Sequence, residues 1–225
     1  MQTLHRMTIK KAAPTTTDPD NPAAAQAEPE KVLVLRACRP DMKSPSSDAN
    51  GFTWPEAGEV IAPDWSPVAE CGRGLHGWLW GEGRLRGNVY QDVIDNPKSR
   101  WLIVEVDATA IVALPGKVKF PRGEVIFVGD REAAVAYLVE RAPSGKSIAF
   151  NTATAGDRGT ATAGYGGTAT AGESGTIAIR WYDPKCDKYR LAVAEVGEQG
   201  IEPATAYFLE IVDGAPQWRR KESRS

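Results

Sequence analysis

The stretch that decides the fold runs from Asn151 to Tyr182 and reads NTATAGDR, GTATAGYG, GTATAGES and GTIAIRWY. An eight-residue unit therefore occurs three times with little change and a fourth time with larger side chains. A fixed period of this kind indicates that each unit is one small structural element that must stack on its neighbours to bury its apolar face. The repeat constrains the architecture strongly and the chemistry hardly at all.

Threonine and alanine alternate within each unit, and glycines follow them. In an extended strand Thr160 and Thr162 face one side, while Ala161 and Ala163 face the other. The glycines supply the backbone freedom for a tight corner. Since eight residues are too few to close a coil around a core, we expect two units per coil in a flat, two-sided β-solenoid with alanine inside. An antiparallel meander is the alternative that the period leaves open.

The fourth unit replaces the small side chains with large ones, namely Ile177, Ile179, Trp181 and Tyr182. Solenoids need a cap that seals the open end of the stack. We therefore interpret this unit as the cap.

The whole chain is predicted to be mainly β and to divide into four segments. An arm rich in proline, alanine and acidic residues lacks the apolar positions that would offset its ordering entropy, so we expect it to be flexible. The globular α+β domain holds short strands and one clear helix, which Asp130 caps and Pro143 stops. The segments are a flexible arm (1–30), the α+β domain (31–142), the repeat solenoid with its cap (143–182), and a C-terminal β hairpin with a basic tail (183–225).

The composition is that of a soluble globular protein, with 42% hydrophobic and 25% charged residues and a net charge of -2 among 225 residues. Binding to nucleic acid is therefore not expected. The apolar runs fall far short of the roughly 20 residues that a membrane span needs, and the N-terminal residues lack the apolar core of a secretory signal. Three widely spaced cysteines fit a reducing cytoplasm.

Few residues are suited to catalysis. The two histidines are His5 in the arm and His76, so a nucleophilic site would have to use His76. Cys71 precedes it by five residues, and in a strand the two would face opposite sides, which favours a buried structural pair. The scattered cysteines do not have zinc-ligand spacing, so no metal or cofactor is expected.

The threonine pairs resemble the flat hydroxyl arrays of ice-binding solenoids. They are Thr152 with Thr154, Thr160 with Thr162, and Thr168 with Thr170. Three ranks divided between two faces give a plane too small to hold a crystal face. We therefore interpret the threonines as residues suited to strands and to cross-strand hydrogen bonds, and set ice binding aside.

Two surface patches are candidates for binding a partner. The first comprises the variable positions of the repeat, which a constant scaffold can present: Asp157, Arg158, Tyr165 and Glu173. The second comprises tryptophans that could anchor an interface: Trp54, Trp65, Trp78 and Trp80. The favoured interpretation of these tryptophans is that they form the core of the globular domain.

A resemblance covers most of residues 31–220. The chain resembles an uncharacterised family of bacteriophage and prophage proteins in the order of four features. These are Cys71-Gly-Arg-Gly-Leu-His76, the strand Arg100–Val106, the ATAG octapeptides and the closing segment Ile201–Tyr207. Its members pair a C-x-x-G-[LF]-H domain with such octapeptides and a short β tail. The resemblance implies a phage or prophage origin and a location in the bacterial cytoplasm, and it assigns no catalytic residues.

Two functions follow as expectations. The first is a non-enzymatic phage accessory protein that engages or inhibits a host protein complex, such as a defence system. An open β edge would also allow a homodimer. The alternative is a small enzyme resembling ADP-ribosyltransferases, which would use NAD and the residues Arg36, His76 and Glu105.

Overall fold

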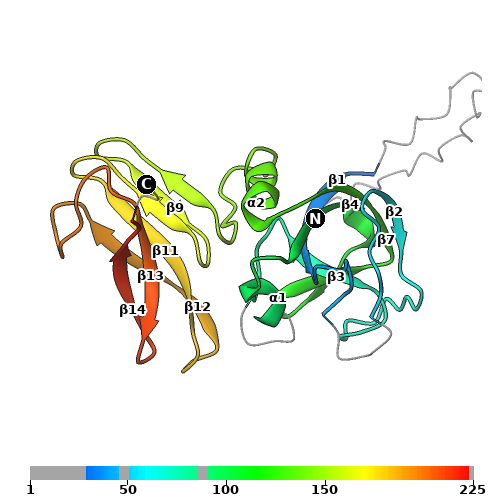
Figure 1. Ribbon diagram of the computed structural model, residues 1–225. Coiled ribbons are helices and arrows are strands. Elements are labelled where there is room, and N and C mark those ends of the chain that lie inside the picture. Colours follow the sequence, from blue (N-terminus) through cyan, green and yellow to red (C-terminus); the bar gives the residue numbers. More distant parts are fainter. Residues whose placement is uncertain (1–28, 46–50, 86–90, 223–225) are drawn as a thin grey trace, which may run out of the picture.

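The computed structural model describes residues 29–45, 51–85 and 91–222. Figure 1 shows two β-rich parts side by side: a strongly curved sheet formed by the N-terminal half and a flatter stack formed by the C-terminal half. The prediction of a mainly β fold is confirmed. The predicted flexible arm lies almost entirely outside the described residues.

The first part is a seven-stranded sheet with the order β2-β7-β4-β1-β3-β6-β5, and all neighbours in it are antiparallel. Its strands are β1 (Lys31–Cys38), β2 (Gly58–Ile61), β3 (Leu75–Leu79), β4 (Arg100–Asp107), β5 (Val112–Leu114), β6 (Lys117–Phe120) and β7 (Arg122–Gly129). The apolar run that begins the domain is β1, in which every residue after Lys31 is buried. This central strand is therefore covered on both faces.

The two faces of this sheet pack against different layers. Leu33 and Leu35 belong to a cluster that includes residues of the helices α1 (Gln91–Asp95) and α2 (Arg131–Val139). Val32 and Val34 alternate with them and belong to the cluster on the opposite, concave face. Both helices lie on the side that faces the repeat part (Figure 1).

The helix predicted from its cap is confirmed. The side chain of Asp130 accepts a hydrogen bond from the backbone N–H of Ala133, which satisfies one of the free donors at the start of α2. The short helices α1 and η1 (Ala108–Ala110) and the strand β2 have no clear sequence pattern and were not predicted.

In the repeat part, parallel strands pair sixteen residues apart. β8 (Thr152–Thr154) pairs with β10 (Thr168–Thr170) in one sheet, and β9 (Thr160–Ala163) pairs with β11 (Thr176–Asp183) in another. Two octapeptides therefore lie between equivalent strands, as predicted. Because the pairs are parallel, the antiparallel meander is wrong for the repeat.

The corners of the repeat are four-residue turns of one kind. In each, the N–H of the fourth residue donates to the carbonyl of the first, and the third residue has a φ between 53° and 68°. The turns are 148–151, 156–159, 164–167 and 172–175, with Phe150, Arg158, Gly166 and Ser174 as their third residues. The pattern thus begins at residue 148, one corner before it is visible in the sequence.

Alanine fills the space between the two sheets. Ala161, Ala163, Ala169 and Ala171 are buried in one cluster, together with the larger Ile177 and Ile179 of β11. The prediction that the fourth unit is the cap is wrong: its isoleucines fill the interior, but the strand Lys188–Glu195 pairs with β11 and covers the edge of the sheet.

The predicted C-terminal hairpin is wrong. β12 (Lys188–Glu195) pairs with β11, whereas β13 (Tyr207–Val212) pairs with β10, so the two strands extend opposite sheets. The predicted basic tail contains a further strand, β14 (Ala215–Arg220), which pairs with β13. The physical reason is that each sheet of the stack ends in its own open edge, and an antiparallel strand covers each edge separately.

Equivalent corner glycines provide a test of this packing. A Cβ added to Gly164 would lie 2.1 Å from the carbonyl oxygen of Ile148, while a Cβ added to Gly156 meets nothing within 4 Å. We expect Gly164→Ala to lower the free energy of unfolding by about 1–3 kcal/mol and Gly156→Ala to change it by less than about 0.5 kcal/mol. Urea unfolding measures both, and equal stabilities would contradict the described stacking.

Candidate functional site

The outer faces of the repeat carry threonines in register. On the β8–β10 sheet Thr152 lies beside Thr168, and Thr154 lies beside Thr170. The hydroxyl oxygens of Thr152 and Thr168 are 3.1 Å apart, within hydrogen-bond distance. Neighbouring strands are about 4.8 Å apart, and alternate residues along a strand are about 6.6 Å apart. The threonines therefore form part of a regular net.

The β9–β11 sheet carries a second, matching set. Thr160 lies beside Thr176, and Thr162 lies beside Ala178. The side chains of Thr160 and Thr162 are exposed. The division of the threonines between two faces, which the sequence predicted, is therefore what the structure shows.

The variable positions of the repeat do not form one patch. Asp157, Arg158 and Glu173 are exposed at neighbouring corners, where the Asp157 side chain accepts a hydrogen bond of 2.9 Å from the Glu173 backbone N–H. Asp157 therefore holds two corners together. Tyr165 lies at a different corner, half-buried between the two parts of the protein.

Tyr165 belongs to a row of aromatic rings that joins the two parts. Its ring lies 6.1 Å from that of Phe150 and 5.9 Å from that of Tyr189. Phe150 in turn contacts Trp101 in the core of the first part, at 5.7 Å. A continuous set of edge-to-face contacts therefore runs from one hydrophobic core to the end of the stack.

A polar contact lies beside this row. Arg84 donates a hydrogen bond of 2.7 Å to the hydroxyl of Tyr182, and it forms an ion pair of 3.0 Å with Asp187. Tyr182 also donates to the Asp187 carboxylate, and this bond raises the pKa of the Tyr182 hydroxyl. Together these contacts fix the tip of the β11–β12 hairpin to the first part.

The tryptophans are divided between core and surface. Trp54 and Trp78 are 2% and 1% exposed, in the clusters on opposite faces of the curved sheet. They match the core interpretation, and as buried rings they offer no surface to a partner. Trp65 and Trp80 are half-buried at the edges of these clusters.

The residues of the alternative enzyme do not converge. Arg36 is paired with Leu102 across β1 and β4, whereas Glu105 is paired with Leu33, three positions away. Because alternate residues of a strand face opposite sides, Arg36 lies on the concave face and Glu105 on the other face. Arg36 is buried and donates a hydrogen bond of 3.1 Å to the carbonyl of His76, so it supports the fold.

His76 lies in a positively charged environment. Burial is the largest cause that lowers the pKa of its imidazole to about 4. The charges of Lys117, Arg36 and Lys119 lower it further. Cys71 contacts Lys117, at 3.0 Å, and no hydrogen bond to His76 is found for it within the described ranges. The arrangement therefore does not support a Cys-His pair.

The part of the chain that the structure describes holds no cluster of three or more histidine, cysteine or acidic side chains suited to a metal ion. Within that same part, the helices are too short and too polar to cross a bilayer.

Comparison with known proteins gives two separate matches. Residues 32–135 match a family described as a domain of unknown function (DUF7666). Ice nucleation proteins are also similar to the chain. That of Pseudomonas syringae pv. syringae is 37% identical over 128 residues, and InaU of Pantoea ananas is 36% identical over 117 residues. These alignments cover 56% and 49% of this chain, but the chain spans only 10% of either relative.

A third relative, the ice nucleation protein of Xanthomonas campestris pv. translucens, is 37% identical over 116 residues, which are 51% of this chain and 7% of the relative. No solved structure matches the chain significantly. These relatives contradict the predicted function of a phage accessory protein that inhibits a host defence system.

The environment of His76 predicts a pH-dependent stability. Its pKa is below the ordinary value of 6.5, so the unfolded chain binds a proton first as the pH falls. The neutral imidazole of His76 makes its full contribution to the free energy of unfolding above pH 6.5. This contribution is lost as the pH falls to about 4. The loss is about 1–3 kcal/mol after allowance for solvent screening.

Urea unfolding at several pH values, on the natural chain and on His76→Gln, measures this contribution. The substitution should flatten the pH dependence across that window. An unchanged dependence in His76→Gln would contradict the assignment.

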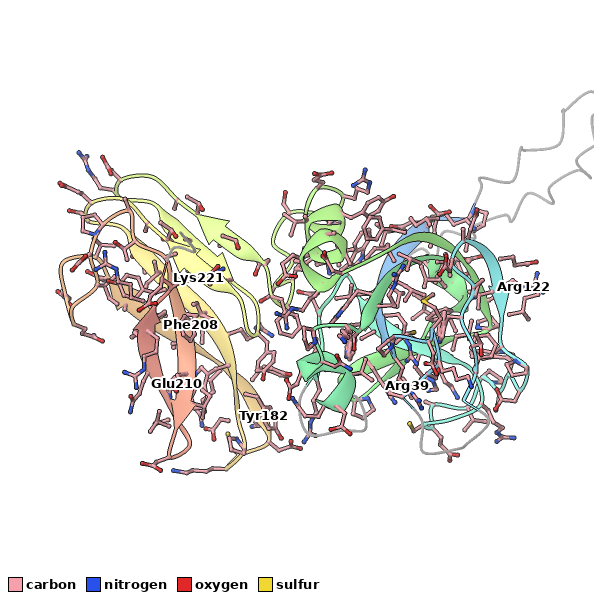
Figure 2. The ribbon with its side chains drawn as sticks, viewed as in Figure 1. Arg39, Arg122, Tyr182, Phe208, Glu210 and Lys221 are labelled. Carbon is pink, nitrogen blue, oxygen red and sulfur yellow. The ribbon has the colours of Figure 1, made fainter. Side chains whose placement is uncertain are left out.

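The junction between the two parts can be tested at Arg84. Arg84→Ala removes the bond to Tyr182 and the ion pair with Asp187, so we expect a loss of about 1–2 kcal/mol in unfolding free energy and a broader range of orientations in small-angle X-ray scattering. Arg122→Ala is the matched control, because Arg122 is exposed on the far side of the first part (Figure 2). Scattering identical to that of the natural chain would show that these contacts do not hold the junction.

Proposed function

We propose that the repeat part is a short β-solenoid whose threonine-bearing faces order water and bind ice. The observation that carries this proposal is the register of the threonines, which places like residues beside each other across parallel strands. The similarity to ice nucleation proteins supports it. The proposal concerns the kind of surface, since the chain spans about a tenth of the first two of those relatives.

The chemistry of such a surface follows from threonine itself. The branched side chain has few rotamers, so a strand holds its hydroxyl and methyl groups in nearly fixed positions. The hydroxyl can donate one hydrogen bond and accept two, as a water molecule can. A fixed net of hydroxyls therefore holds water in a lattice with less loss of entropy than a mobile surface would require.

The size of the surface sets how strong the effect can be. Two parallel strands in each sheet span about 5 Å between their axes, so a single copy presents a very small template. The plane of threonines is small, as the sequence indicates. Its small area limits the strength of binding to ice but does not prevent such binding. We therefore expect measurable ice affinity and weak nucleation from one copy.

The curved sheet has a structural part in this proposal. Trp101 of the sheet, with Gly81 and Arg84 of the loop that follows β3, contacts the first corner and the hairpin tip of the repeat. A stack of alanine and glycine buries little apolar surface, and the first part covers the end at which the stack begins. The first part thus acts as the N-terminal cap that solenoids require.

The test is the uptake of fluorescently labelled protein into slowly growing ice. We expect the natural chain to enter ice, and the double variant Thr154→Lys with Thr162→Lys to lose this ability, because each hydrated ammonium group disrupts a flat face. Thr53→Lys is the control, since Thr53 is exposed and lies outside the repeat.

A control protein of similar charge is excluded from growing ice, and its residual signal sets the baseline. Uptake of the natural chain at this baseline would contradict the proposed function. Equal uptake by the double variant and the natural chain would show that the threonine faces are not the binding surface.

A further inference from the structure

The outer face of the β9–β11–β12 sheet is larger than the repeat alone suggests. β12 pairs with β11 over eight residues without a shift in register, so the side chains of three strands lie in straight rows. The rows are Thr160–Thr176–Glu195 and Thr162–Ala178–Val193, followed by Arg180–Leu191. In the second row Thr162 and Val193 are exposed and carry methyl groups, while Ala178 between them is only 3% exposed.

Two aliphatic side chains on this face are exposed to an unusual degree. Val193 and Leu191 are 52% and 51% exposed, and they are two residues apart on the same strand. Among the described residues six large hydrophobic side chains are exposed, and Val193 and Leu191 are the most exposed of them; Phe208, beside Thr168 on the opposite face, is 36% exposed. Val193 and Leu191 lie on β12 beside the rows that contain the threonines, so they extend the face with apolar groups.

The opposite face, on the β14–β13–β10–β8 sheet, has a different character. Thr168 is only 8% exposed, and Thr170 is half-buried. The register of β10 with β13 places Phe208 beside Thr168. Beyond it, Glu210 forms an ion pair of 2.6 Å with Arg219. Charged groups therefore lie close to the threonines of this face, as Glu195 and Arg180 do on the other face, so the burial of Thr168 and Thr170 is what distinguishes the two faces.

The opposite face is also partly closed off. Ala206 and Lys221, at the end of the Thr170 row, line a gap of about 850 Å³ whose other wall includes Ile94 and Arg131 of the first part. Figure 2 shows Lys221 and Phe208 on the β13–β14 strands of the repeat part. A planar solid surface that approached these threonines would meet the first part before it reached the whole row.

We propose that ice binds to the outer face of the β9–β11–β12 sheet, and that Val193 and Leu191 of β12 belong to this binding surface. The inference rests on the proposed function and deepens it by naming the face and by adding residues outside the repeat. Within the described ranges, the first part forms hydrogen bonds with this sheet at its far end, through Tyr182 and Tyr189. The rows that contain Thr160 and Thr162 remain open.

The physical basis is the combination of two kinds of group. Threonine hydroxyls in register give fixed hydrogen-bonding points for water. Between them, the exposed methyl groups of Val193 and the threonines restrict the orientations of neighbouring water without binding it. A face that offers both kinds of group in an exposed position matches a solid water lattice better than one on which Thr168 is buried and Thr170 half-buried.

Matched single substitutions separate the two faces. Thr154 and Thr162 are exposed, eight residues apart, and occupy the same position in successive units. We expect Thr162→Lys and Val193→Lys each to abolish uptake into ice, and Thr154→Lys to retain it. Circular dichroism and urea unfolding show whether each variant keeps its fold. If Thr162→Lys unfolds, Thr162→Ser replaces it and should reduce uptake by loss of the methyl group.

The outcomes distinguish this inference from the proposed function. Uptake that is lost in Thr154→Lys but kept in Thr162→Lys and Val193→Lys would overturn the assignment of the face, while ice binding itself would stand. Loss in Thr162→Lys with full uptake in Val193→Lys would remove β12 from the surface. No uptake of the natural chain would overturn both proposals together.

Discussion

The repeat part depends on the close approach of backbone to backbone. At Gly164 the neighbouring turn is so near that a single added carbon would lie 2.1 Å from a carbonyl oxygen, and at Gly172 it would lie 2.2 Å from the Asp157 carboxylate. Glycine at the corners and alanine between the sheets make this distance available. The small side chains therefore set the close approach of the two sheets and of the corners, while the hydrogen bonds between parallel strands set the net of threonines on the outside.

The ends of the stack are where the rest of the protein is needed. Parallel strands with alanine interiors bury little apolar surface, so an isolated pair of coils would be marginal. The first part covers the beginning, where Trp101 contacts the ring of Phe150, and β12 and β13 cover the two sheet edges at the other end. The fold is thus one short run of repeat enclosed by elements that do not repeat.

Ice binding offers a consistent account of why the outer faces look as they do. Threonine alone is explained by its preference for strands, but that preference does not explain two exposed aliphatic side chains in line with it on β12. A surface that combines hydroxyl and aliphatic groups accounts for both, with Glu195 and Arg180 in the rows on either side of Thr162 and Val193. The curved sheet, with its buried Arg36 and its neutral His76, shows no comparable surface in the residues described.

The amino-acid sequence by itself determined the strand-and-corner unit, the alternation of threonine and alanine, and the capped helix at Asp130, because each is a local pattern of period two or a local hydrogen bond. Only the tertiary structure decided which sheets β12 and β13 join, which residues of β1 and β4 share a face, and which threonines stay exposed. Those outcomes depend on contacts between residues far apart in the chain, such as Ala169 with Tyr207, and no local pattern encodes them.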